Sequence, residues 1–128
     1  MHYYDDIDIA ISDILNSLGM TAKHIGYRYL RFGIRMMVES PDKTLMVTKH
    51  IYPEIAKSFH ASSAMVERNI RHCIDYIWTK SQSPYPFAGV RYYDSRRPTN
   101  GTLLAAIAET VLSKGVVDGP FIHTMRIS

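Results

Sequence analysis

Residues 51–78 read IYPEIAKSFHASSAMVERNIRHCIDYIW, and this stretch decides the fold. Proline is tolerated in a first helical turn, so a short helix is predicted from Pro53 to about Phe59. The tight connection that follows contains Ser62 and Ser63, and either serine can cap a second helix. That longer helix carries one apolar stripe at helical spacing: Val66, Ile70, Cys73, Ile74, Ile77 and Trp78. The pattern predicts a helix-turn-helix over about residues 53–79.

Two further helices are predicted before this motif. The first ends at Gly19, where a left-handed cap fits. Its apolar face consists of Ile7, Ala10, Ile11, Ile14, Leu15 and Leu18. The second follows the connector 20–26 and stops at the turn of residues 40–42, because the residue before a proline disfavours helix. Its inward residues are Tyr27, Leu30, Ile34, Met37 and Val38.

A long loop and a last helix are predicted after the motif. Prolines break the periodicity over residues 80–98, and we interpret this stretch as a loop with one helical turn around Phe87. Apolar spacing returns over about residues 99–114, and the tail after them shows no clear period. No stretch alternates at period two for long enough to predict a sheet. The predicted fold class is therefore all-α, a compact bundle of about six helices in a single domain, residues 1–128.

The composition fits a protein that folds without disulfides or a membrane. A chain of 128 residues with 46% hydrophobic content is sufficient for one domain with its own core. Cys73 is the sole cysteine, so no intramolecular disulfide can form. The first residues mix aspartates with isoleucines, unlike a signal peptide, and no apolar run approaches the roughly 18 residues of a membrane span. We therefore expect a cytoplasmic protein with no membrane partner.

The charge is unevenly distributed along the chain. The formal net charge is +3, and four acids lie before Ile14 with no Lys or Arg among them: Asp5, Asp6, Asp8 and Asp13. The remainder is therefore more basic than the whole, which favours a polyanionic partner such as nucleic acid. On charge alone, a basic protein without such a partner is an equally good interpretation.

The outward face of the longer helix holds the candidate binding residues. Arg68 and Arg71 are three residues apart and project together, so each can donate two hydrogen bonds to a guanine, worth roughly 1–3 kcal/mol of discrimination. Glu67 can accept from cytosine N4 or hold an arginine in place. The alternative is an ordinary solvated helix face with a local Glu and Arg pair.

The segments 51–57 and 66–74 closely resemble the C-terminal effector domain of the sporulation master response regulator of endospore-forming bacteria. Residues 25–31, IGYRYLR, resemble the helix of that family that contains glycine, tyrosine, leucine and arginine. Residues 97–100, RPTN, resemble the family's motif before its last helix. The resemblance covers about residues 7–115.

The resemblance implies a six-helix domain that binds double-stranded DNA and reads a short box through the longer helix. It also implies a head-to-tail homodimer on tandem boxes, a contact with RNA polymerase sigma factor, and a position close to DNA for His72 and the basic loop. The residues expected to contact bases are Glu67, Arg68, Arg71 and His72. Those expected to contact the DNA backbone are Lys49, Lys57, Ser62, Ser63, Arg96 and Arg97.

Three departures from the family pattern qualify these expectations. Met65 stands where the family usually has an arginine, which removes one contact and alters the preferred sequence. The loop over residues 79–100 is shorter than the family's and lacks its helical segment, which bears on the sigma factor contact. No receiver domain precedes the effector region in this sequence, so we expect a fragment or a standalone regulator that binds constitutively, as a repressor or a competitor for a full-length regulator's sites.

Other functional classes have weaker support. The histidines are scattered with no acid or cysteine partners at a metal-binding spacing, and no metal or other cofactor is expected. Cys73 lies on the apolar stripe, which predicts a packed thiol rather than a nucleophile. No paired carboxylates, phosphate-binding loop or catalytic triad indicates an enzyme. The alternative function is a protein-interaction module or antagonist that keeps the fold but pairs with a full-length relative, and Met65 favours it.

Overall fold

The computed structural model describes residues 4–40 and 46–114, and all regular structure in these two ranges is helical. The five α-helices are α1 (Tyr4–Ser17), α2 (Ile25–Glu39), α3 (Tyr52–Phe59), α4 (Ser63–Lys80) and α5 (Asn100–Ser113). Two short elements accompany them: a π-helical stretch, η1 (Val47–Ile51), and a 3₁₀ turn, η2 (Ala88–Val90). The all-α prediction is confirmed, although these ranges hold five α-helices rather than about six. The unpatterned tail lies outside the described residues.

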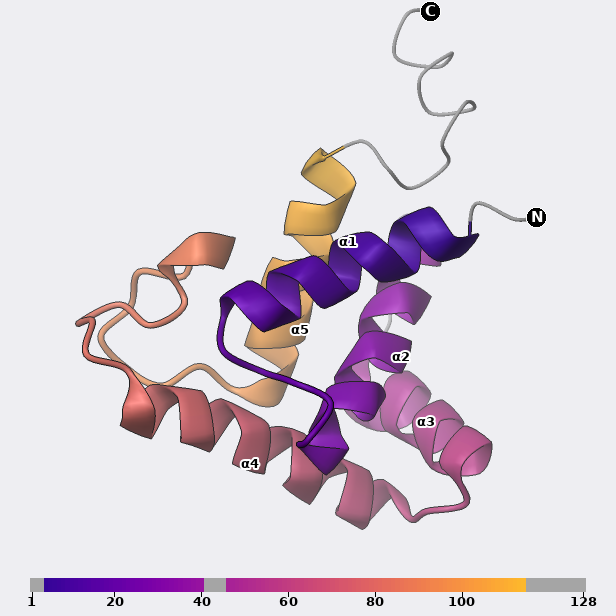
Figure 1. The fold of residues 1–128 in the computed structure, drawn as a ribbon. Coiled ribbons are helices and arrows are strands. Elements are labelled where there is room, and N and C mark those ends of the chain that lie inside the picture. Colours follow the sequence, from indigo (N-terminus) through magenta and orange to yellow (C-terminus); the bar gives the residue numbers. More distant parts are fainter. Residues whose placement is uncertain (1–3, 41–45, 115–128) are drawn as a thin grey trace, which may run out of the picture.

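Helix α2 lies at the centre of the packing, because it contacts α1, α3, α4 and α5. Figure 1 shows α4 along the lower edge of the molecule and the other α-helices above it. The core consists of apolar side chains at helical spacing from all five helices, among them Ile11, Leu15, Leu30, Ile34, Ile55, Ile70, Ile74 and Leu104, each with no exposed surface. Burial of these stripes, worth roughly 1.5–3 kcal/mol for each large side chain, holds the helices together.

A glycine sets the distance between α2 and α4. A Cβ atom added at Gly26 would lie 2.4 Å from the backbone oxygen of Asn69 and 2.7 Å from the sulfur of Cys73, both in α4. Real Cβ contacts are essentially never shorter than 3.0 Å. The glycine therefore lets the two helix backbones touch, and this contact fixes the position of α4 against the core.

The loop between α4 and α5 is anchored by aromatic side chains. Phe87 is fully buried and stacks on Trp78, with ring centroids 6.2 Å apart and planes 17° from parallel. Tyr92 donates its hydroxyl hydrogen to the carbonyl of Arg96 at 2.6 Å, whereas Tyr93 is 61% exposed. The turn η2 ends at Arg91, which adopts the left-handed conformation (φ 62°, ψ 31°). The loop is thus fastened to the far end of α4.

Candidate nucleic-acid interface

The helix-turn-helix consists of α3, a connection of residues 60–62, and α4. His60 ends α3 in the left-handed conformation (φ 54°, ψ 47°), and its N–H and that of Ala61 both donate to the carbonyl of Ala56. Ser62 then caps α4 by accepting a hydrogen bond from the N–H of Met65 at 3.1 Å. Of the two serines left open by the sequence, Ser62 is the cap. Hydrogen bonds therefore hold both ends of the connection, and they set the direction of α4 relative to α3.

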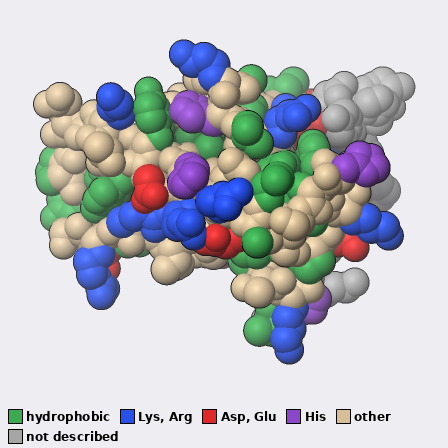
Figure 2. Space-filling view, turned by 90° about the horizontal axis from the view of Figure 1, so that it is seen from below, with side chains coloured by type: hydrophobic (Ala, Val, Ile, Leu, Met, Phe, Trp, Pro, Cys, Tyr) green, Lys and Arg blue, Asp and Glu red, His purple; other side chains and the backbone are tan. Residues whose placement is uncertain are grey.

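One face of α4 is buried and the opposite face is open. Its buried residues are Val66, Ile70, Cys73, Ile74 and Ile77. Arg68 and His72 are exposed on the outer face, and neither forms a hydrogen bond or ion pair with another residue of the described ranges. Figure 2 views the molecule from this side and shows Lys and Arg side chains gathered along its middle, with His, Asp and Glu side chains beside them. The outer face thus offers unused hydrogen-bond donors.

Arg71 is already paired. Its Nη1 donates to both carboxylate oxygens of Glu67, at 2.7 and 2.5 Å, one helical turn away. The two side chains are 42% and 37% exposed, so water screens the pair and its contribution to stability is small. The structure therefore shows Arg68 and Arg71 in different states: the first unpaired, the second held by its neighbour.

Arg97 and Asn100 fasten the start of α5 to α4. The Nε of Arg97 donates to the carboxylate of Asp75, and Nη2 donates to the backbone carbonyl of Arg71 at 3.1 Å. The amide of Asn100, which is buried, donates to the backbone carbonyl of Glu67 at 3.1 Å and to the hydroxyl of Tyr52 at 2.9 Å. We call Arg97, Asn100, and the α4 carbonyls they bind the latch.

The latch is the part of the site that sequence reasoning missed. Arg97, a predicted phosphate contact, is 27% exposed and also forms bonds within the domain. Asn100 and Asp75 are not among the predicted site residues. The available signal is the resemblance of residues 97–100 to a family motif, since a buried asparagine just inside a helix start needs hydrogen-bond partners. Arg97 also borders a groove beside α4.

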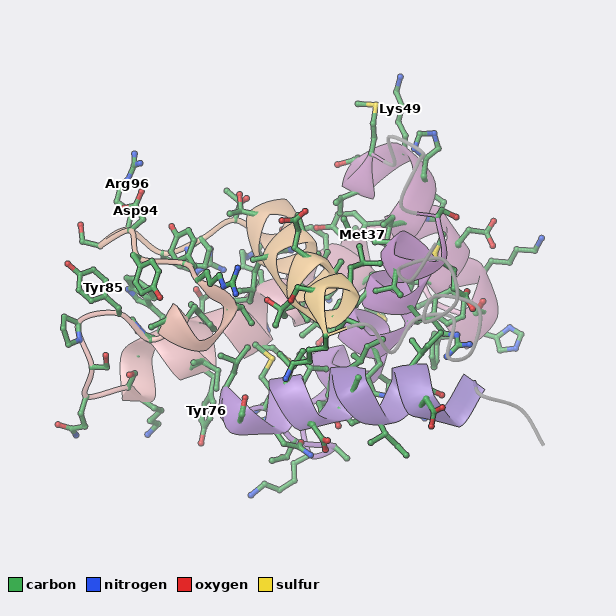
Figure 3. The ribbon with its side chains drawn as sticks, turned by 90° about the horizontal axis from the view of Figure 1, so that it is seen from above. Met37, Lys49, Tyr76, Tyr85, Asp94 and Arg96 are labelled. Atoms are coloured by element: carbon green, nitrogen blue, oxygen red, sulfur yellow. The ribbon has the colours of Figure 1, made fainter. Side chains whose placement is uncertain are left out.

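A groove of about 420 Å³ runs beside α4 and is bordered by η1, α4 and the start of α5. Its lining includes Val47, Thr48, Tyr52, Glu67, Arg71, Arg97, Thr99, Asn100 and Gly101. Lys49 and Arg96 project on the same side of the molecule, away from α1 (Figure 3). Arg96 is 85% exposed and forms an ion pair with Asp94 at 2.8 Å. Basic side chains are therefore available on both sides of this groove.

The remaining predicted contacts are exposed. Lys57 lies in α3, while Ser62 and Ser63 lie at the start of α4. Ser62 uses its side-chain oxygen as the helix cap, and a hydroxyl that accepts one bond can still donate its hydrogen to a phosphate. The free N–H groups and positive dipole at this end of α4 also favour an anion.

Burial and hydrogen bonding shift several pKa values in this part of the molecule. Burial raises the pKa of the Cys73 thiol to about 11, so Cys73 is a packed neutral thiol in the core. Burial also raises the pKa of Tyr52 above 10.0, against the effect of the Asn100 hydrogen bond. Hydrogen bonds from Arg96 lower the pKa of Asp94 to about 2. Asp94 therefore stays ionised beside Arg96, whose Nη1 donors are not used by this pair.

Within residues 4–40 and 46–114, no helix combines the length and the apolar character that a membrane span requires. No group of three or more His, Cys, Asp or Glu side chains gathers there in an arrangement that suits a metal ion.

An all-helical domain that holds a capped helix outward, with basic residues along it and beside it, has the arrangement typical of helix-turn-helix DNA-binding domains. The family model described as "Sporulation initiation factor Spo0A C terminal" matches residues 11–111, and the chain belongs to that family. The match contains α2, α3 and α4 entirely, the second half of α1 and most of α5. The chain is thus a DNA-binding effector domain of a sporulation transcription regulator, and the resemblance noted in the sequence is confirmed.

Proposed function

We propose that this domain recognises a specific double-stranded DNA sequence by placing the outer face of α4 in the major groove. The observation that carries the proposal is the unpaired, exposed guanidinium of Arg68, one turn from exposed His72 on a helix fixed by the latch. A major groove admits an α-helix, and arginine donates two parallel bonds to the O6 and N7 atoms of guanine. Arg68 and His72 are therefore assigned to base edges.

Arg71 reads DNA in a different way from Arg68. Its guanidinium is held by Glu67 but still has unused donors, because both hydrogen bonds to that carboxylate come from Nη1. Glu67 thus acts on DNA chiefly by holding Arg71 in one orientation, which reduces the entropy that Arg71 loses on binding a base. The carboxylate also repels phosphates and so disfavours a wrong register.

The phosphate contacts surround this helix. Lys49 lies on η1, Lys57 on α3 and Arg96 on the loop before α5, while Ser62 and Ser63 lie at the α4 N-terminus. Arg97 is retained as a phosphate contact through the donors that its latch bonds leave unused. Each neutralised phosphate releases counterions, so affinity should fall steeply as salt rises.

The experiment begins with selection of a preferred box from random oligonucleotides, followed by fluorescence anisotropy on that box and on a scrambled duplex. Arg68→Ala is expected to weaken binding to the box by roughly 5- to 150-fold and to leave binding to the scrambled duplex nearly unchanged. Lys57→Ala should weaken both duplexes alike and reduce the salt slope by about one phosphate. Lys114→Ala, an exposed lysine just beyond α5, is the control. Equal losses on both duplexes for Arg68→Ala refute base reading.

A head-to-tail homodimer on tandem boxes and a contact with RNA polymerase sigma factor belong to the same proposal. Both are supported by the family resemblance. Mass measurement on duplexes with one box and with two boxes tests the dimer: cooperative binding of two chains only on the tandem duplex supports it. Independent binding to each box contradicts it.

A second function has one specific observation in its favour. Met65 is 41% exposed at the start of α4, at the position where the family usually has arginine. An apolar side chain there suits a protein contact, in which the domain pairs with a full-length relative instead of reading DNA. Met65→Arg separates the two: a gain in DNA affinity supports DNA reading, whereas loss of binding to such a relative, with DNA affinity unchanged, supports the interaction module.

A further inference from the structure

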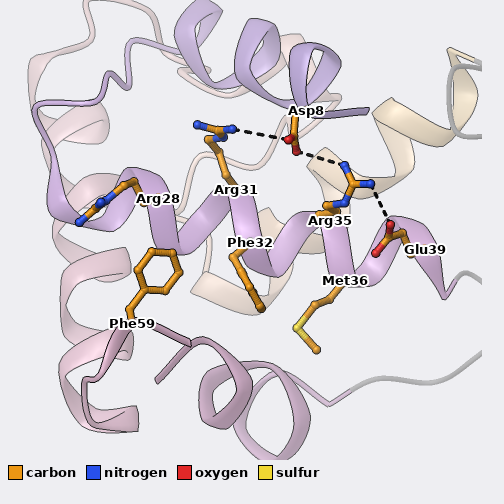
Figure 4. A pocket seen from close by; sticks show the side chains of 8 residues that line it. All are labelled: Asp8, Arg28, Arg31, Phe32, Arg35, Met36, Glu39 and Phe59. Carbon is orange, nitrogen blue, oxygen red and sulfur yellow. Dashed lines mark hydrogen bonds and ion pairs between the residues drawn. The ribbon is translucent and has the colours of Figure 1, made fainter. Parts of the chain in front are cut away.

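A second concave surface lies on the outer side of α2. It is a groove of about 480 Å³ that is open to solvent and bordered by α1, α2 and the end of α3. Its lining residues are Asp8, Arg28, Arg31, Phe32, Arg35, Met36, Glu39 and Phe59, as Figure 4 shows. None of them belongs to α4 or to the loop after it, so this α2 groove is separate from the DNA-reading surface.

The α1 side of the α2 groove is a cationic rim. Arg28, Arg31 and Arg35 follow one another along α2 at spacings of three and four residues, which places them along one flank of the helix. Asp8 is shared by two of them, at 3.2 Å from Arg35 and 3.8 Å from Arg31, and Glu39 lies 3.0 Å from Arg35. Within the described residues, Arg31 and Arg35 therefore share these carboxylates, and Arg28 lies beside them on the same flank.

Hydrogen-bond donors remain unused on this rim. The Nε atom of Arg31 is buried and has no acceptor among the described residues. Arg28 is exposed and contacts the face of the Phe59 ring, 5.5 Å from its centroid, without a carboxylate partner in the described ranges. Because the Arg31 Nε atom is buried, the exposed Arg28 guanidinium is the group that offers a ligand carboxylate both charge and hydrogen bonds.

The floor of the α2 groove is apolar and already formed. Phe32 and Phe59 meet edge to face, with centroids 5.8 Å apart and planes at 77°, and Tyr29 braces Phe59 from the other side at 5.3 Å. Met36 continues the floor along α2 and has the flexible side chain that adapts to different apolar partners. Charge and apolar surface thus run side by side along the same helix.

We propose that the α2 groove binds an acidic amphipathic helix of a partner protein. Its carboxylates would lie along the arginines, and its apolar residues on Phe32, Met36 and Phe59. The span from Arg28 to Glu39 is about 16 Å at 1.5 Å per residue, which matches about three turns of a docked helix. Nucleic acid suits the surface less well, since Asp8 and Glu39 repel phosphates and the floor offers aromatic rings in place of further donors.

The probe is a fluorescein-labelled helical peptide of about 15 residues, with three glutamates at spacings of three and four and leucines on the adjacent flank. Two control peptides have glutamine in place of glutamate, or the same residues scrambled around the helix. The acidic peptide is expected to bind, and amide NMR shifts should change along α2 and at Phe59 but not at Arg68. Because no groove residue belongs to α4, saturating DNA should change the peptide's Kd by less than about threefold.

Two charge reversals on the intact chain decide the assignment. Arg28→Glu should weaken the acidic peptide by at least about tenfold, whereas Lys23→Glu, an equal change at an exposed lysine on the α1–α2 connector, should have little effect. Melting curves check that both variants are folded. The proposal is overturned if both variants bind the acidic peptide with the same affinity, or if the glutamine peptide binds the unaltered chain as tightly as the acidic peptide does. It is also overturned if the peptide changes amide NMR shifts only in α4. A homodimer that Arg28→Glu dissolves likewise overturns it, because that result would assign the groove to a second copy. The DNA assays on the same samples keep this outcome separate from that of the DNA proposal.

Discussion

The contact between α2 and α4 at Gly26 leads to a quantitative prediction for Gly26→Ala. The new Cβ would lie 2.4 Å from a backbone oxygen of α4, whereas ordinary contact begins at 3.4 Å. The neighbour is main chain, so it cannot rotate away, and the two helices must separate by about 1 Å. Overpacking of this kind costs typically 1–3 kcal/mol.

A matched control isolates that cost. Gly101 occupies the second residue of α5, as Gly26 occupies the second residue of α2, so Gly→Ala brings a similar change in helix propensity at both positions. At Gly101 the nearest atom to an added Cβ is a Val47 methyl at 3.4 Å, an ordinary contact. Gly101→Ala should therefore be neutral or slightly stabilising.

Thermal unfolding followed by circular dichroism measures the difference. We expect Gly26→Ala to melt roughly 4–12 °C below Gly101→Ala, from about 4 °C for each kcal/mol in a domain of this size. Removing the Cys73 sulfur as well should restore only part of the loss, because the Asn69 backbone remains in the way. If the two alanine variants melt at the same temperature, the close approach does not limit the packing of α4 and the reasoning is refuted.

Three further outcomes are expected. Asn100→Ala should lower the free energy of unfolding by about 1–3 kcal/mol in urea denaturation, because it removes the donor to two acceptors, and a loss below about 0.5 kcal/mol would contradict a structural role for the latch. Ser62→Ala should cost about 1 kcal/mol and Ser62→Gly only a few tenths, since glycine tolerates the cap position; equal costs would argue against capping. The raised Cys73 pKa means that the unfolded thiol ionises first, so stability should be retained below pH 9.0 and fall by on the order of 2 kcal/mol as pH rises to about 11. Cys73→Ala should show a shallower decline over that range, and an unchanged slope would rule the thiol out as its cause.

The local pattern of the sequence was enough to predict the all-helical class and the inward face of α4. Val66, Ile70 and Ile74 are fully buried, because apolar residues at helical spacing lie on one face of the helix and that face packs against the core. The helix count was less predictable. The residues just before α3 form the π-helical stretch η1, which continues directly into α3. The spacing of apolar residues does not show whether such a stretch is a separate helix or the start of the next one.

The site was harder to predict, because its geometry depends on contacts between distant residues. Arg68 and Arg71 have the same side chain and lie three residues apart, yet one is unpaired and the other binds Glu67. Arg97 lies in a basic run that predicts a phosphate contact, and the fold also brings it to Asp75, 22 residues away in the sequence. The local sequence does not reveal these pairings, because they depend on how the loop lies along α4.

The latch grips α4 through the main-chain carbonyls of Glu67 and Arg71, not through their side chains. Every amino acid supplies the same carbonyl, so substitution at either position leaves both attachment points in place. Positioning of α4 therefore depends on main-chain atoms, whereas the DNA contacts that we propose depend on side-chain atoms. A domain built in this way can acquire a new target sequence by point mutation while the docking angle of its reading helix is inherited unchanged.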